Sequence, residues 1–82
     1  MRDTKELLGI MLENIERIDN GGMCRLVDFL WLSGVISVDE AILLDDYLIQ
    51  NEPTDRDISA FWFKRGEVEP RKKWLEEEIK KL

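Results

Sequence analysis

Apolar residues recur every three or four positions in several stretches of this sequence, and this spacing constrains the fold more than any other feature. The first stretch contains Leu7, Leu8, Met11, Leu12, Ile15 and Ile18, with charged residues between them. One side of such a segment is apolar and the other polar, which is typical of an amphipathic α-helix. Asp3 or Thr4 is suited to cap its start, and residues 20–22 (Asn-Gly-Gly) predict its end.

A second helix is predicted from about Met23 to Leu32, ended by the Ser33-Gly34 pair. Its apolar stripe consists of Leu26, Val27, Leu30 and Trp31. Because this segment is more apolar than the first, we expect it to lie at the centre of the fold and Cys24 to be a small buried residue.

A third helix is predicted to begin at a capping box, in which the side chains of Ser37 and Glu40 each bond the other residue's backbone amide. Its apolar residues are Ile42, Leu43, Leu44, Tyr47, Leu48 and Ile49. They cover a broad arc, which favours packing against two partners. Pro53 predicts that the helix has ended by residue 52.

The last third of the chain contains one ambiguous stretch and one clear helix. Residues 58–63 are too few to assign by periodicity, and they fit a short helix or turn better than an extended segment. Pro70 suits the start of a last helix with an apolar face of Trp74, Leu75, Ile79 and Leu82. The 82 residues therefore predict a single all-α domain, 1–82, of three main helices plus a short C-terminal helix.

Composition excludes several kinds of site. The chain has no histidine and one cysteine, which removes Ser-His and Cys-His nucleophilic sites and clustered zinc sites. Asp45 and Asp46 diverge by about 100° on a helix and would not converge on one ion. We therefore expect no enzyme activity, no metal and no cofactor. A charged N-terminal stretch and the lone cysteine favour the cytoplasm, and so short a chain favours a homo-oligomer.

Charge is unevenly distributed along the chain. The net charge is −6, yet from residue 61 onward there are 7 basic and 5 acidic side chains. Four aromatic and five basic residues fall within positions 61–74, and the candidate ligand-binding residues are Trp62, Lys64, Arg65, Arg71, Lys72 and Trp74. Aromatic rings stack on bases, and cations hold phosphate at a helix start, so the pattern predicts a nucleotide site. The alternative is that the rings complete the core and the cations are solvated.

Acidic residues dominate the first sixty positions, with 13 acidic and 5 basic side chains. The candidate protein-binding residues are Glu13, Glu16, Asp39, Glu40, Asp45 and Asp46. Such a face could imitate a phosphate backbone and dock on a basic groove, although an ordinary solvated surface would have the same composition. The acidic surface also argues against direct binding to a nucleic-acid duplex.

The C-terminal pattern of Trp62, Phe63, Gly66, Pro70-Arg71 and Trp74-Leu75 resembles a family of small uncharacterised bacteriophage and prophage proteins, over about residues 24–82. The resemblance implies an accessory protein that counters host defence, with no catalytic residue. Two hypotheses follow: the protein binds and sequesters a nucleotide-derived host signal, or it is an acidic inhibitor that binds a host defence or nucleic-acid-handling enzyme.

Overall fold

The computed structural model describes residues 1–17, 23–51 and 68–82. Its helices are α1 (Thr4–Asn14), α2 (Met23–Leu32), α3 (Val38–Gln50) and α5 (Val68–Lys81), and a 3-10 helix, η1 (Ile15–Arg17), continues α1. These parts of the chain contain no strand, so the predicted all-α class is confirmed. The C-terminal helix has 14 residues and is longer than expected. The interpretation of residues 58–63 lies outside the described residues.

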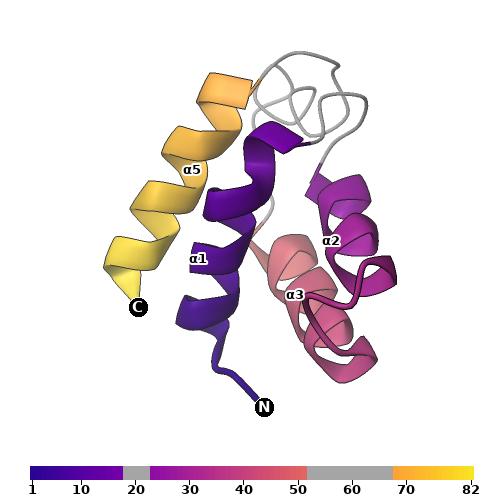
Figure 1. Ribbon diagram of the computed structural model, residues 1–82. Coiled ribbons are helices and arrows are strands. Elements are labelled where there is room, and N and C mark those ends of the chain that lie inside the picture. Colours follow the sequence, from indigo (N-terminus) through magenta and orange to yellow (C-terminus); the bar gives the residue numbers. More distant parts are fainter. Residues whose placement is uncertain (18–22, 52–67) are drawn as a thin grey trace.

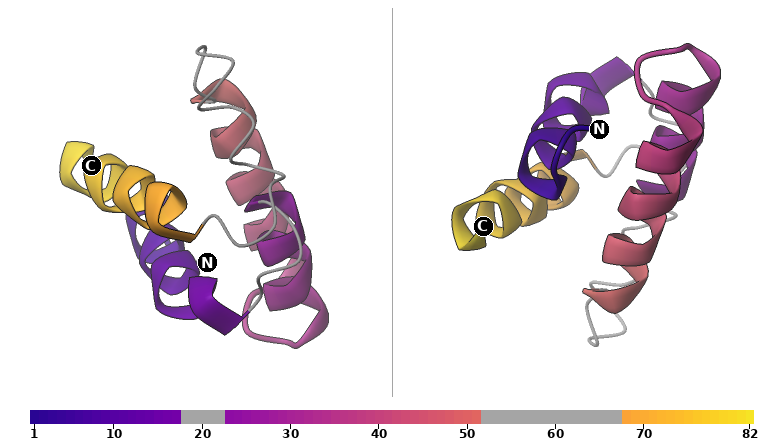
Figure 2. Two further views of the ribbon diagram at one scale, coloured as in Figure 1. Left: turned by 90° about the horizontal axis from the view of Figure 1, so that it is seen from above. Right: turned by 90° about the horizontal axis from the view of Figure 1, so that it is seen from below.

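The helices form two pairs, α1 with α5 and α2 with α3 (Figures 1 and 2). Helix α1 contacts all three of the others, whereas α2 contacts mainly α3. The expectation that α2 is central is therefore wrong. The buried residues of α1, among them Leu7, Leu8 and Met11, reach both pairs, so its position matters more than the higher apolar content of α2.

Among the described residues, the core is a cluster of buried apolar side chains from α1, η1, α2, α3, α5 and the turn before α3. It comprises Leu7, Leu8, Met11, Ile15, Met23, Leu26, Val27, Leu30, Ile36, Ala41, Leu44, Leu48 and Leu75. Several residues that the sequence assigned to apolar faces lie outside it: Trp31, Ile42 and Ile49 are exposed, as is Cys24. Among the described elements, helix α3 packs mainly against α2 and α1, and Ile42 and Ile49 lie outside that side.

The turn between α2 and α3 is fixed by backbone hydrogen bonds. Gly34 has φ +81°, a left-handed conformation that glycine adopts without strain. Its amide donates to the Trp31 carbonyl at 3.0 Å, and the Val35 amide donates to the Leu30 carbonyl at 2.9 Å. This pair of bonds is the Schellman motif, so the predicted end of α2 at Ser33-Gly34 is confirmed.

The predicted starts of α1 and α3 are also confirmed, whereas α5 begins at Val68, two residues before the predicted start at Pro70. The Asp3 side chain accepts a hydrogen bond from the Glu6 amide at 2.8 Å and caps α1. At the start of α3, the Ser37 hydroxyl accepts from the Glu40 amide at 3.1 Å, and the Glu40 carboxylate accepts from the Ser37 amide at 2.9 Å. The capping box is therefore complete.

Glu40 also binds the N-terminal segment, which the sequence did not indicate. Arg2 donates from its backbone amide, from Nε and from Nη2 to this carboxylate, at 3.1, 2.9 and 3.0 Å. The same Nη2 donates to the Val35 carbonyl at 2.7 Å. Glu40 is buried, and these bonds tie residue 2, the α2–α3 turn and the start of α3 together.

A second buried carboxylate joins α3 to α5. Glu78 is buried and accepts a hydrogen bond from the Tyr47 hydroxyl at 3.1 Å. Lys81 pairs with the same carboxylate at 2.6 Å. The burial of Glu78 and its bond to Tyr47 are not indicated by the sequence, because they depend on how α5 lies against α3.

Acidification tests the role of Glu40. Hydrogen bonds from Arg2 and from the Ser37 amide hold the pKa of the Glu40 carboxylate well below its usual range. The ionised form therefore stabilises the fold fully above the unfolded-state pKa of about 4.3, and this contribution is lost as pH falls from there towards the folded-state pKa. We expect Glu40→Gln to melt at a lower temperature than the wild type at pH 7, with the difference narrowing below about pH 4.

The measurement is thermal unfolding by circular dichroism from pH 7 to pH 2. Glu77→Gln, a change at an exposed carboxylate of α5, serves as the control and should follow the wild-type curve. Parallel curves for Glu40→Gln and the wild type would contradict this role of Glu40.

Candidate functional site

Two cations of the expected nucleotide site, Arg71 and Lys72, lie in the described part of the chain, and both take part in the packing of α5. Arg71 is 4% exposed and belongs to the interior side of α5, so the expectation that it is solvated is wrong. Trp74 is half-buried and packs against the core cluster. Trp62, Lys64 and Arg65 lie outside the described residues, so the proposed nucleotide site stays a prediction.

Lys72 bridges α5 and the end of the first helical segment. Its Nζ lies 3.0 Å from a carboxylate oxygen of Glu16 and 3.8 Å from one of Glu69. The hydrogen bond to Glu16 and the charges of both carboxylates raise the pKa of Lys72. Its charge is therefore already balanced within the protein, which weakens it as a phosphate ligand.

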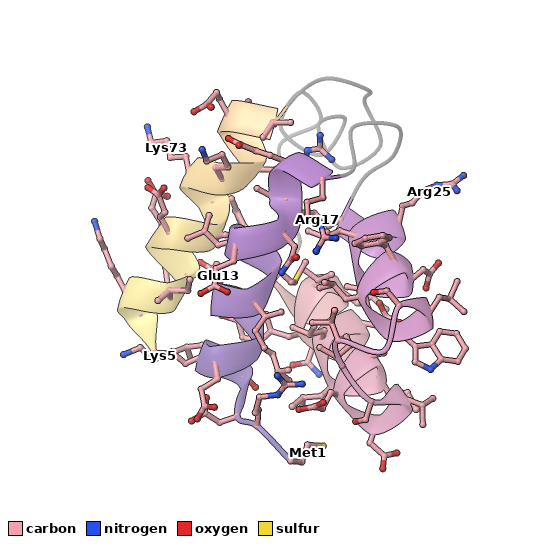
Figure 3. All side chains as sticks on the ribbon, in the orientation of Figure 1. Met1, Lys5, Glu13, Arg17, Arg25 and Lys73 are labelled. Carbon is pink, nitrogen blue, oxygen red and sulfur yellow. The ribbon has the colours of Figure 1, made fainter. Side chains whose placement is uncertain are left out.

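The predicted acidic residues do not form one surface. Glu13 lies on α1 (Figure 3), Glu16 is paired with Lys72, and Glu40 is buried with Arg2. The idea that Glu40 belongs to an exposed acidic face is therefore wrong. Asp39 and Asp46 are exposed on α3, and Asp45 beside them is half-buried.

Asp45 belongs to a group of three acidic residues, of which only two were predicted from the sequence. Burial raises the pKa of its carboxyl, and the charges of Asp28 and Asp46 raise it further. Asp28, on α2, was not among the predicted residues. Its position in the sequence could have indicated its exposure. Asp28 lies outside the apolar stripe of Leu26, Val27 and Leu30, on the side of α2 that faces away from the core.

No described cation relieves this cluster of like charges. The ion pairs among the described side chains engage Glu16, Glu40, Glu69 and Glu78, and none engages Asp28, Asp45 or Asp46. Figure 3 shows Lys73 on the outer side of α5 and Arg25 extending away from α2. The three aspartates therefore form an unbalanced negative centre at the α2–α3 pair.

Exposed apolar side chains lie beside these aspartates. Trp31 is 43% exposed, Val38 50%, Ile42 55% and Ile49 71%. Residues 38, 42, 45 and 49 follow one another at intervals of four, three and four, so they form one row along α3. We define the α2–α3 face as Asp28 and Trp31 of α2 with Val38, Ile42, Asp45 and Ile49 of α3.

The described residues were also compared with the requirements of a metal site and of a membrane span. In residues 1–17, 23–51 and 68–82, no group of three acidic or cysteine side chains is arranged to hold a metal ion. None of the helices described is long and apolar enough to cross a membrane.

Comparisons with known proteins give no match: no family model, no curated protein and no solved structure is significantly similar to this chain. The resemblance to phage proteins stays a prediction from the sequence.

The burial of Arg71 predicts a structural effect on mutation. Arg71→Glu places a carboxylate where a buried guanidinium stands, and we expect it to lower the free energy of unfolding by about 2–4 kcal/mol. Lys73→Glu, the same reversal at an exposed position of the same helix, should cost less than about 0.5 kcal/mol. Urea unfolding followed by circular dichroism measures both, and equal stabilities would show that Arg71 is not held in the interior.

Proposed function

We propose that the protein is a non-catalytic binding module that docks its α2–α3 pair on a basic surface of another protein. The observation that carries this proposal is the group of Asp28, Asp45 and Asp46: burial and then the two neighbouring charges raise the pKa of Asp45, and no described cation pairs with any of the three. A partner's lysine or arginine would relieve this repulsion, so association gains more than it would at an isolated surface carboxylate.

The class of partner follows from the charge and from the sequence resemblance. Enzymes that handle nucleic acids carry basic grooves for phosphates, and an acidic face can occupy such a groove. The resemblance to phage proteins supports a host defence or nucleic-acid-handling enzyme as the partner. We therefore favour the acidic inhibitor over sequestration of a nucleotide signal, because Arg71 is buried and Lys72 is paired.

Charge removal tests the docking proposal. The triple variant Asp28→Asn, Asp45→Asn, Asp46→Asn is compared with Glu6→Gln, Glu76→Gln, Glu77→Gln, which removes three exposed charges from α1 and α5. Each protein is immobilised and exposed to bacterial lysate. We expect the wild type and the control variant to retain the same lysate protein, and the aspartate variant not to retain it. The bound protein should be released near 1 M salt, where the screening length is about 3 Å.

Equal retention by the aspartate variant, or no protein retained by the wild type, would contradict the proposal.

Nucleotide sequestration makes a separate prediction. Calorimetry with a panel of cyclic and linear nucleotides should give no saturable binding tighter than about 1 mM if the protein acts through its acidic face alone. Saturable binding that Lys72→Ala weakens about tenfold would restore the nucleotide hypothesis. Lys80→Ala, at an exposed lysine in the last turn of α5, is the control and should bind as the wild type does.

A further inference from the structure

The exposed row on α3 has one acidic position among three apolar ones, and this arrangement indicates the shape of its partner. Asp45 stands three residues after Ile42 and four before Ile49, so one carboxylate lies between two exposed isoleucines. With a rise of about 1.5 Å per residue, the row from Val38 to Ile49 extends over about 16 Å, or three helical turns. A helix of comparable length fits a row of these dimensions.

We propose that the α2–α3 face binds one amphipathic helix of another protein, which carries two apolar residues seven positions apart and an arginine or lysine midway between them. This inference rests on the proposed function and names its partner's chemistry. The apolar residues of the partner would cover Ile42 and Ile49, its cation would meet Asp45 and Asp28, and Trp31 would flank it from α2.

The negative charge of the α2–α3 face disfavours three other partners: a second copy of the chain, an anionic membrane and a nucleic acid. A second copy that paired through the same face would bring two sets of Asp28, Asp45 and Asp46 together, and like charges in a dry interface are costly. An anionic membrane surface or a nucleic acid would meet the same repulsion. The homo-oligomer predicted from chain length would have to use other exposed apolar residues, such as Leu32.

The test uses synthetic helical peptides of about 18 residues, long enough to cover the about 12 residues of the row with a turn to spare. The first peptide has two leucines seven positions apart with an arginine midway, the second has glutamate in place of that arginine, and the third moves the arginine to the opposite side. Each of the three peptides is made in four versions, in which the leucines and the charged residue stand at different positions along the peptide. We expect micromolar binding of the first peptide and at least about tenfold weaker binding of the other two.

Variants of the protein complete the test. Ile42→Ser and Asp45→Asn should each weaken the arginine peptide by about tenfold, while Glu77→Gln on α5 leaves it unchanged. Asp45→Arg should reverse the preference, so that the glutamate peptide binds better than the arginine peptide. This reversal cannot come from partial unfolding, and circular dichroism of each variant checks its helical content.

Three results would overturn the inference: no saturable binding of any arginine peptide, equal binding of the arginine and glutamate peptides, or a concentration-dependent dimer that Ile42→Ser abolishes. A further result separates the two proposals. If no peptide binds, but the lysate protein is retained by the wild type and not by the triple aspartate variant, the docking proposal stands and the inference of a helical partner is wrong. If the triple variant retains the lysate protein, both fail.

Discussion

The Glu40 carboxylate connects three parts of the chain that no other described polar contact brings together. It accepts hydrogen bonds from Arg2 near the N-terminus and from Ser37 at the start of α3, and Arg2 also bonds the Val35 carbonyl in the turn. Helix α1 begins two residues after Arg2 and contacts α2, α3 and α5. Holding Arg2 therefore sets the α1–α5 pair against the α2–α3 pair at one end, while the apolar cluster fills the space between them.

Local signals in the sequence predicted the local structure well. Asp3, the capping box at Ser37 and the glycine after α2 each act within a few residues, so their hydrogen bonds can be inferred from spacing alone. The pairing of Glu40 with Arg2 joins residues 38 positions apart, and no local rule indicates it. The same holds for Glu78, whose burial depends on the approach of α3 to α5.

The candidate site was harder to predict. The spacing of apolar residues shows which of them share one side of a helix, but it does not show which side is covered by other helices. Helix α3 is apolar both at Leu44 and Leu48, which are buried, and at Ile42 and Ile49, which are exposed. Only the position of α2 and α1 distinguishes the two sides. The acidic composition was correctly noted, but its members separate into paired, buried and unpaired carboxylates once the helices are in place, and Asp28 enters only through its nearness to Asp45.

The turn from Ser33 to Ser37 has a consequence for recognition. The Schellman bonds at its start and the capping box at its end occupy adjacent residues, and Arg2 bonds the carbonyl of Val35 between them. Little backbone freedom remains in this turn, so α2 and α3 hold their outer residues at a fixed angle, ready for the association proposed above. A rigid surface loses little entropy on association, and evolution can therefore alter affinity through single outward side chains without having to rebuild the scaffold beneath them.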